Sequence, residues 1–470
     1  MCHLQNKGIK KSLRLLRVAV ILPIFFCSTF ALAAGPEGSA KKEGGGRPII
    51  SERVKQSAAA GEQVAVLVKL KEKWESPSVE KMTTASDPQH HMSKQDIKRL
   101  QKEVLASSFS SDESKEIHRL DNIPWITGRI NRNAFEKLKA HPNVAMIVED
   151  SRVKAHLAES GPLIGSETVH TAGYQGNGVA VAVIDSGIDT DHPDLQDDLL
   201  WEECFLYTGG CPGTAGPRAS GPGSAEDGYG HGTHVSGIIT SGHPTYAGIA
   251  PVAKIVALKV LDDTGSGWTS DILAAIDWAV TNKDIYGIRV INLSLGSNSI
   301  YSGSCDLSNP APAAAANAAK AAGIVLFASS GNDGDITGMS EPACLSSTIS
   351  VGAVYDADLR AENWGACRDA QTGPDQIVCF SNVSTDLNIL APGAEIDSSG
   401  RGGGIVNYSG TSMASPHAAG LAALMIEKNP FLSPDDIESI LETTGLQTYD
   451  GRVDLFFPRI EAVGALNSTP

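Results

Sequence analysis

The sequence predicts an α/β body built on a mostly parallel sheet with helices on both faces, preceded by a small α+β domain. From about residue 176 onward, apolar runs alternate with helical segments. These runs are apolar throughout, which is typical of parallel strands buried on both faces. A shorter series of alternating elements lies upstream, over 63–150. A chain of 470 residues is longer than one typical domain, so two or three units are expected.

The first 33 residues have the pattern of a secretory signal. Five cations between Lys7 and Arg17 precede the apolar run 18–32, and the segment ends in Ala-Leu-Ala. The pattern predicts cleavage after Ala33 and a secreted protein, extracellular or periplasmic. An uncleaved anchor is the alternative, but about fifteen apolar residues are short for a span. We therefore expect no stable membrane span after signal removal. Residues 34–62, with a glycine triplet at 44–46, are interpreted as a flexible linker.

Two folded units are predicted after the linker, a small domain over 63–155 and a body over 156–470. Helical spacing and strand-like runs define the elements of each. In the small domain these are strand 63–69, helix 93–107, strand 125–130, helix 133–141 and strand 144–150. In the body they are strands 179–184, 254–261, 290–295 and 324–329, and helices 231–240, 270–281 and 311–322.

Charge is divided unevenly along the chain. Residues 161–470 carry 36 acidic and 12 basic side chains, a net of −24, whereas the remaining residues carry 18 and 26, a net of +8. The acidic body argues against binding to nucleic acid, whose phosphates require lysine and arginine. Solubility is the simpler interpretation of this charge. The alternative is that a basic N-terminal segment docks on the acidic body.

Six cysteines follow the signal, and an even number in an exported chain predicts disulfides. Many pairings are possible. Short loops favour Cys204–Cys211 and Cys367–Cys379, which leaves Cys305 with Cys344. The spacings do not match those of a zinc site, so bridges are favoured over metal.

Three segments carry the residue types of a nucleophilic hydrolase. The run GTSMASPHAAG at 410–420 places Ser412 between a glycine turn and the start of a helix. That placement exposes the hydroxyl and directs the positive end of the helix dipole toward it. The run AVIDSGID at 182–189 contains Asp185, and HGTHVSG at 231–237 contains His231. Each motif alone is weak, but the three together in the order Asp, His, Ser are specific. Asp185 also directly follows a predicted strand, and active sites of parallel sheets lie at the carboxyl ends of the strands.

At these residues the chain resembles the subtilase family of serine endopeptidases, over about residues 165–460. The resemblance implies that Ser412 is the nucleophile, His231 the general base and Asp185 the group that fixes the imidazole tautomer. The run FASSGNDG at 327–334 resembles the family's oxyanion segment. It assigns the stabilising amide to Asn332, with the backbone N–H of Ser412 as second donor. His234, the second histidine of its motif, is expected to be packed in the helix.

The resemblance also implies polypeptide substrates, held in extended form between two strips of chain by strand addition. A first specificity pocket would lie beside one strip. The implied residues are Ser294, Leu295 and Gly296 for one strip, Gly265, Ser266 and Gly267 for the other, and Leu295, Ser329, Ser330 and Gly331 for the pocket.

Asp333 and Glu341 are expected near the mouth or base of that pocket. Two carboxylates there would favour lysine or arginine before the scissile bond. Solvated surface acids are the alternative interpretation.

The small domain resembles the inhibitory propeptide of subtilases, and residues 143–150 match the last strand of that propeptide. The resemblance implies a precursor that cleaves itself near 153–160 and whose propeptide acts as an intramolecular inhibitor. An ordinary accessory domain is the alternative.

Two features depart from the family pattern. Subtilases commonly bind calcium through an early aspartate, matched here by Asp194, and a loop inside the helix of the histidine motif. The corresponding loop, 241–248, has no carboxylate or amide side chain. Calcium needs six or more oxygens, so structural calcium is unsupported there, and no cofactor is expected for the chemistry. The stretch 201–227, rich in glycine and proline, is interpreted as a disulfide-pinned surface loop near the cleft.

Other functions were weighed against the endopeptidase. A non-catalytic peptide-binding or adhesion protein would share the fold, but all four catalytic positions are intact. An esterase is disfavoured, because the serine motif lacks the second glycine of G-x-S-x-G and the chain order differs. A metalloprotease is disfavoured because HExxH does not occur.

Overall fold

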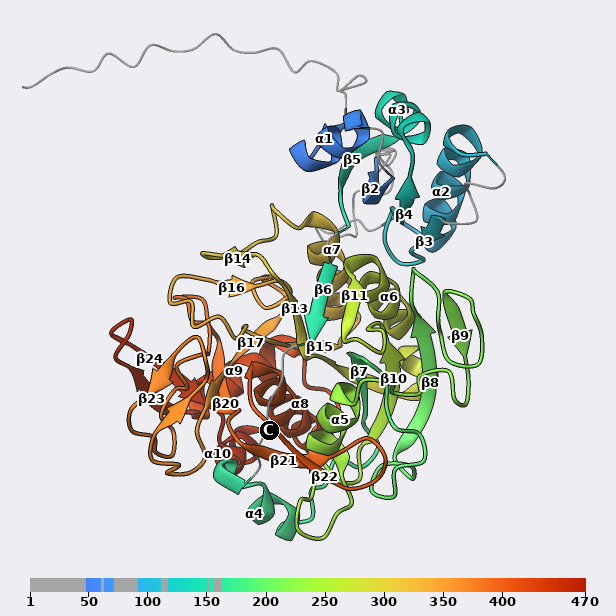
Figure 1. Cartoon of the computed structure of the whole chain (residues 1–470). Coiled ribbons are helices and arrows are strands. Elements are labelled where there is room, and N and C mark those ends of the chain that lie inside the picture. Colours follow the sequence, from blue (N-terminus) through green and yellow to red (C-terminus); the bar gives the residue numbers. More distant parts are fainter. Residues whose placement is uncertain (1–47, 61–62, 72–91, 111–116, 151, 156–161) are drawn as a thin grey trace, which may run out of the picture. The chain divides into compact units, whose positions relative to one another are not determined.

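The fold comes from a computed structural model that describes residues 48–60, 63–71, 92–110, 117–150, 152–155 and 162–470 (Figure 1). The predicted signal and most of the predicted linker lie outside these residues. The described residues all belong to the unit Arg47–Pro470.

A ten-stranded sheet forms the centre of the body, in the order β23-β24-β20-β17-β15-β12-β7-β10-β8-β9. The strands from β24 through β8 run parallel to their neighbours. Only the outermost strands, β23 and β9, pair antiparallel. This confirms the predicted α/β class. The bounds are β7 Ala180–Asp185, β8 Leu199–Phe205, β9 Arg218–Ser220, β10 Lys254–Lys259, β12 Ile288–Leu293, β15 Val325–Ser329, β17 Ile349–Val354, β20 Ile389–Pro392, β23 Leu446–Asp450 and β24 Leu455–Arg459.

Helices cover both faces of this sheet because each strand sends alternate side chains to two different cores. In β7, Val181 and Val183 pack in the core that contains α5 and α8. The neighbouring Ala182 and Ile184 pack in the other core, with α6 and α7. The helices of the body are η3 Pro162–Ile164, α4 Ser166–Thr171, α5 His231–Thr240, α6 Thr269–Tyr286, α7 Pro310–Ala321, α8 Thr411–Lys428, α9 Pro434–Thr444 and α10 Ala462–Ser468.

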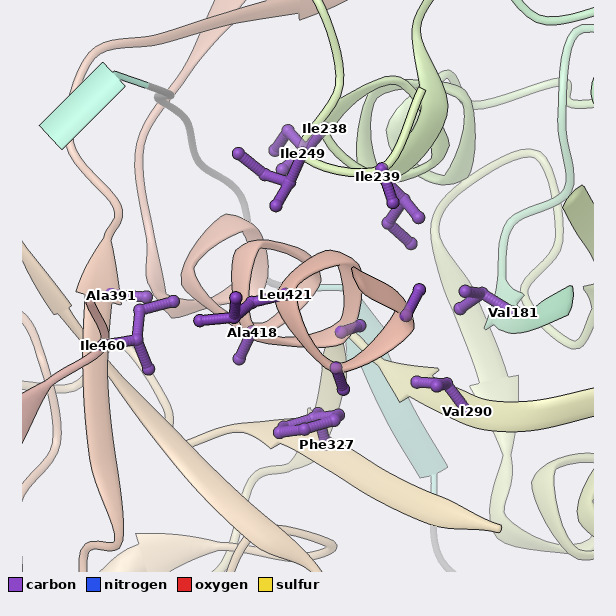
Figure 2. Close-up of a cluster of buried hydrophobic side chains, with 14 of the residues drawn as sticks. Val181, Ile238, Ile239, Ile249, Val290, Phe327, Ala391, Ala418, Leu421 and Ile460 are labelled. Carbon is purple, nitrogen blue, oxygen red and sulfur yellow. The ribbon is translucent and has the colours of Figure 1, made fainter. Parts of the chain in front are cut away.

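Helix α8 is buried on all sides from Thr411 to Ile426. A helix that is apolar all round belongs inside a core rather than on a surface. Figure 2 shows Ala418 and Leu421 of α8 between Ile238 of α5 and Phe327 of the sheet. The rigid packing of α8 fixes the residues at its N-terminal end.

The small domain has a five-stranded sheet in the order β1-β5-β2-β4-β3. Its first elements lie within the range predicted as linker. Among the side chains of α1 that the structure describes, those of Val54 and Ala58 are buried, a pattern too weak to indicate a helix from sequence. Helix α2 is capped by Ser93, whose Oγ accepts a hydrogen bond from the N–H of Asp96 at 3.2 Å. The bounds are β1 Ile49–Ile50, α1 Glu52–Ala60, β2 Val64–Leu70, α2 Lys94–Ser108, β3 Ile117–Arg119, β4 Trp125–Ile130, α3 Arg132–Ala140 and β5 Val144–Glu149.

Smaller sheets complete the structure. The most relevant to function is three-stranded, in the order β11-β6-β13. It comprises β6 Arg152–Ala155, β11 Ser266–Trp268 and β13 Leu295–Ser297. The remaining pairs are β14 Ile300–Tyr301 with β16 Met339–Ser340, β18 Glu362–Asn363 with β19 Arg368–Asp369, and β21 Ile396–Ser399 with β22 Ile405–Tyr408.

The stretch 201–227 differs from its interpretation as a surface loop. Its first residues belong to β8, a strand inside the large sheet, and it returns through β9. The strand was not predicted from the sequence because β8 contains two glutamates, Glu202 and Glu203. Both are buried, and Glu202 accepts backbone hydrogen bonds from Gly223 and Ala225 at 2.9 and 3.2 Å. Cys204 and Cys211 join the strand to the following turn.

All three predicted disulfides are present, and each joins segments within the body. They are Cys204–Cys211, Cys305–Cys344 and Cys367–Cys379. Within the described ranges, none of the helices has both the length and the apolar character needed to cross a membrane.

Candidate active site

Asp185 and His231 meet at the carboxyl end of the parallel sheet. Asp185 is the last residue of β7, and His231 is the first residue of α5. Both side chains are fully buried, and Nδ1 of His231 lies 2.7 Å from Oδ1 of Asp185. The same oxygen accepts a hydrogen bond from the N–H of Ser186 at 2.7 Å. A carboxylate on Nδ1 holds the proton there, which leaves Nε2 as the basic nitrogen.

Asp227, which sequence analysis did not single out, fixes the start of α5. Its buried carboxylate accepts hydrogen bonds from the backbone of Gly230 at 2.8 Å and of Thr233 at 3.0 Å. It also accepts one from Oγ of Ser186 at 2.9 Å. Burial raises the pKa of Asp227, but the hydrogen bonds from Gly230 and Thr233 and the charge of Lys259 outweigh burial, so the pKa is lowered and the group is ionised. One carboxylate therefore joins the two turns that carry the aspartate and the histidine. Asp227 lies three residues before Gly230, the N-cap of α5, so the preference for acidic residues at an N-cap gave no signal for it.

Ser412 lies in the first turn of α8 as expected, but it is fully buried, so the prediction of an exposed hydroxyl is wrong for this structure. Its Oγ donates a hydrogen bond to the carbonyl oxygen of Ser294 at 3.2 Å. Pro416, one turn further on, has no N–H for the carbonyl of Ser412. Oγ of Ser294 donates to that carbonyl instead. The proline of the motif thus frees a backbone carbonyl, which connects Ser412 to the strip at Ser294.

Asn292, near the end of β12, makes a second contact between the strands and α8. Its Nδ2 donates to Oγ of Ser294 at 2.9 Å, and its Oδ1 accepts from Oγ of Ser415 at 2.7 Å. This amide joins the strand side of the site to α8.

The amide of Asn332 is anchored beside the serine. Its Oδ1 accepts hydrogen bonds from the N–H of Thr411 at 2.7 Å and from the Thr411 hydroxyl at 3.0 Å. Because the amide is planar, its NH₂ group then faces away from Thr411. Thr411 directly precedes Ser412, so Asn332 and Ser412 have a common anchor. The N–H of Gly331 completes the contact by donating to Oγ1 of Thr411 at 3.1 Å.

The two predicted substrate strips form the edges of the three-stranded sheet. In β13, Leu295 and Gly296 pair antiparallel with residues 155 and 154 of β6. In β11, Ser266 and Gly267 pair antiparallel with residues 154 and 153 of the same strand. Gly265 precedes β11 in a tight turn, with φ of 71°. The structure therefore brings both strips to one extended segment.

The predicted pocket residues Ser329 and Ser330 lie at the end of β15 and are fully buried. Oγ of Ser329 is 3.5 Å from the carbonyl of Leu295, which joins the pocket to the strip. The two acidic residues expected near the pocket, Asp333 and Glu341, differ in burial. Asp333 is exposed, as expected of a solvated acid, whereas Glu341 is only 4% exposed. Burial raises the pKa of Glu341 to about 7.

His234 is fully buried, with Nε2 3.2 Å from the carbonyl of Ile396, and so is a packed helix residue as predicted. Over the described ranges, groups of three or more His, Cys, Asp or Glu side chains that could hold a metal ion do not occur.

Serine hydrolases that act on extended peptides are the class of protein in which such a site is found. Comparison with known proteins narrows the class. The model of the subtilase family matches residues 176–457. Subtilisin NAT of Bacillus subtilis subsp. natto is 37% identical over 331 residues, covering 68% of this chain and 75% of that protein.

A second relative and one solved structure are also similar to the chain. M-protease of Shouchella clausii (strain KSM-K16) is 34% identical over 349 residues, covering 72% of this chain and 78% of that protein. A solved cold adapted subtilisin-like serine proteinase aligns with a TM-score of 0.49 and 26% identity, over 62% of this chain and 90% of that one. The chain belongs to the subtilase family, and it is a serine endopeptidase whose catalysis needs no cofactor.

Proposed function

We propose that the chain is a secreted endopeptidase that hydrolyses peptide bonds in proteins through an acyl-enzyme and is made as a self-processed precursor. The observation that best supports this proposal is the position of β6 in the three-stranded sheet. The segment just ahead of the body lies as the central strand between β11 and β13, where an extended substrate would lie. β6 ends at Ala155, opposite Leu295, and the adjacent Ser294 contacts the hydroxyl of Ser412. The proposed cleavage site is therefore shortly after Ala155.

The proposed reaction uses the four catalytic positions in two half-reactions. The hydroxyl of Ser412 turns from Ser294 to His231, whose Nε2 takes the proton as Oγ attacks the carbonyl carbon. Asp185 stabilises the imidazolium. The oxyanion accepts hydrogen bonds from Nδ2 of Asn332 and the N–H of Ser412. His231 then protonates the leaving amine. In the second half-reaction His231 takes a proton from water, which attacks the acyl-enzyme, and then returns the proton to Oγ of Ser412 as the carboxylic acid is released.

The contacts of the small domain with α6 support its role as the propeptide. The carboxylate of Asp150 accepts a hydrogen bond from the N–H of Ser270 in the first turn of α6, at 2.7 Å. Further along this helix, the carboxylate of Asp277 accepts from the backbone of Asp121 and Asn122 at 2.5 and 2.6 Å. These contacts hold the domain on the helix that follows β11. We propose 1–33 for the signal, a linker that begins at 34 and ends before β1, a propeptide that runs from β1 to residue 155 and so begins earlier than the predicted residue 63, and 156–470 for the catalytic domain.

The test is to express the full chain and analyse the exported protein by mass spectrometry and with a fluorophosphonate probe. We expect a mature chain that begins between residues 156 and 162 and that is labelled on Ser412. An exported chain that still carries 63–155 in covalent linkage and does not react with the probe would contradict both parts of the proposal.

Release of the propeptide is expected to depend on the charge of Asp150. Burial raises the pKa of this carboxyl to about 7, against the hydrogen bonds from Ser270, while Arg129 lowers it and Glu149 raises it. An acid whose pKa is raised in the complex is bound best when protonated, so affinity falls as pH rises from the free value toward the raised one. Asp271 adds to this, because burial and the nearby Asp150 raise its pKa as well.

The measurement compares wild type with Asp150→Asn, which keeps an acceptor for Ser270 but cannot ionise. Activity is followed as it appears after processing. The ratio of the release rates, wild type over variant, is expected to rise by up to about tenfold per pH unit between about pH 5 and 7. The ratio removes the contribution of His118, whose pKa burial lowers to about 4, because it opposes the trend equally in both chains. The ratio retains Asp150 together with its effect on Asp271. A ratio that does not change with pH would refute the prediction.

A further inference from the structure

We infer that Asn382 is a positioning residue for the reaction, which holds the segment 330–335 so that the amide of Asn332 faces the developing oxyanion. The inference rests on the oxyanion role proposed above for Asn332. Asn382 lies between β17 and β20, 50 residues after Asn332 in the chain, and its side chain is fully buried.

The side-chain amide of Asn382 binds the chain just after Asn332. Its Oδ1 accepts hydrogen bonds from the N–H of Asp333 at 2.9 Å and of Asp335 at 3.0 Å. Its Nδ2 donates to Oδ2 of Asp333 at 3.1 Å. An amide is suited to this role because it offers an acceptor and a donor on one planar group.

The backbone of Asn382 binds the chain just before Asn332. Its N–H donates to the carbonyl of Gly331 at 3.0 Å, and its carbonyl accepts from Oγ of Ser330 at 2.9 Å. Asn382 therefore contacts residues on both sides of Asn332. It acts on the proposed oxyanion donor through the path of the backbone.

The contact between the segment and Asn382 is close. Gly331 has φ of 116°, in the region that favours glycine. A Cβ at this position would lie 2.2 Å from Nδ2 of Asn382, so only glycine lets the backbone rest on the amide. With Thr411 holding Oδ1 of Asn332 from the other side, the amide is fixed between two anchors.

The turn that carries Asn382 is itself attached to the body. Nη1 of Arg452 donates to the carbonyls of Cys379 and Ser381 at 2.9 and 3.1 Å. The same guanidinium forms an ion pair with the buried carboxylate of Asp450 at 2.7 Å. Because its own turn is held in this way, Asn382 can hold the segment 330–335 in one position.

A donor aimed at the oxyanion acts in the transition state and contributes little to substrate binding. Asn382→Ala is therefore expected to lower kcat by about tenfold or more and to change KM by less than about threefold. Removing the donor itself, in Asn332→Ala, is expected to cost about 10²–10³-fold in kcat, the size known for subtilisin. Both are measured on a short peptide anilide and as the single-turnover rate of self-cleavage in the full-length precursor.

The deciding experiment is the double variant. If Asn382 acts through Asn332, adding Asn382→Ala to Asn332→Ala should lower kcat by less than about twofold further. The same fold loss in both backgrounds, or an effect confined to KM, would overturn the inference. An unchanged kcat in Asn332→Ala would instead refute the proposed oxyanion role, so the two failures are distinguishable.

Asn388 provides the matched control. Its amide accepts from the N–H of Ser350 at 3.0 Å and donates to Glu438 at 3.0 Å, away from the segment 330–335. Asn388→Ala is expected to lower the thermal unfolding temperature without changing kcat. If Asn388→Ala and Asn382→Ala lower kcat alike, the effect is general destabilisation and the inference fails.

A reciprocal exchange keeps the test valid if Asn382→Ala does not fold. Asn382→Asp alone removes the donor to Asp333 and sets two carboxylates against each other, so kcat should fall. Adding Asp333→Asn restores a donor and acceptor pair while the two backbone N–H groups keep their acceptor. Recovery of kcat to within about threefold of wild type supports the inference, and an exchange that recovers only the unfolding temperature contradicts it.

Discussion

Replacing Ser412 with alanine is expected to abolish proteolysis and to leave the precursor uncut. Without Oγ the proposed acyl-enzyme cannot form, although strands β11 and β13 and the amide of Asn332 remain. The expected fall in kcat is about 10⁶-fold, the size known for the serine of subtilisin itself. Hydrolysis of a denatured protein and the intact mass of the full-length product measure the two effects.

Ser415→Ala is the matched control for this substitution. Ser415 lies one turn further along α8, is equally buried, and donates to Asn292 at 2.7 Å. Its loss should weaken packing and lower activity far less than the loss of Ser412. Processing of the Ser412→Ala chain at the wild-type rate would show that another group cleaves the precursor.

Asp185→Asn is expected to lower kcat by about 10⁴-fold while the chain still folds. The carboxylate accepts from Nδ1 of His231 at 2.7 Å. An amide at this position can donate to Nδ1, which would place the imidazole proton on Nε2, where the base is needed. The measurement is kcat on a short peptide anilide, with circular dichroism to show that the fold is retained.

Asp189→Asn tests whether the loss comes from the pair with His231 or from any aspartate of the same motif. Asp189 is buried four residues on, and its carboxylate accepts from the N–H of Gly402 at 2.6 Å. We expect a kcat within about tenfold of wild type, since this carboxylate orients a loop rather than the imidazole. Equal losses in the two variants would remove the special role of Asp185.

Much of the fold could be predicted because most residues of the central strands are apolar. The four proposed catalytic positions fall in short motifs, and the topology of a parallel sheet brings the ends of its strands together. Asp185 ends β7 and Asn332 follows β15, as the strand predictions required. The positions of Asp185 and Asn332 in the fold could therefore be predicted mostly from the sequence around each residue.

The residues that sequence reasoning missed depend on distant contacts. Asn382 binds Asp333 across 49 positions, and nothing in its neighbourhood marks it. Asp227 lies in a stretch interpreted as a loop, where its hydrogen bonds to the turn before α5 could not be inferred. Strand β8 was missed because Glu202 and Glu203 are charged, although backbone and hydroxyl donors stabilise them inside the sheet.

The central place of β6 between two strands has a consequence for the proteins that this enzyme would degrade. A segment that pairs on both sides must first give up any hydrogen bonds it makes along both of its own edges. A helix or an inner strand can do so only when it opens locally, which costs the free energy of that opening. The rate at which a target protein is degraded should therefore depend more on how often the target segment unfolds than on the side chains at the cleavage site. Compact proteins should be degraded more slowly than the same chains after denaturation.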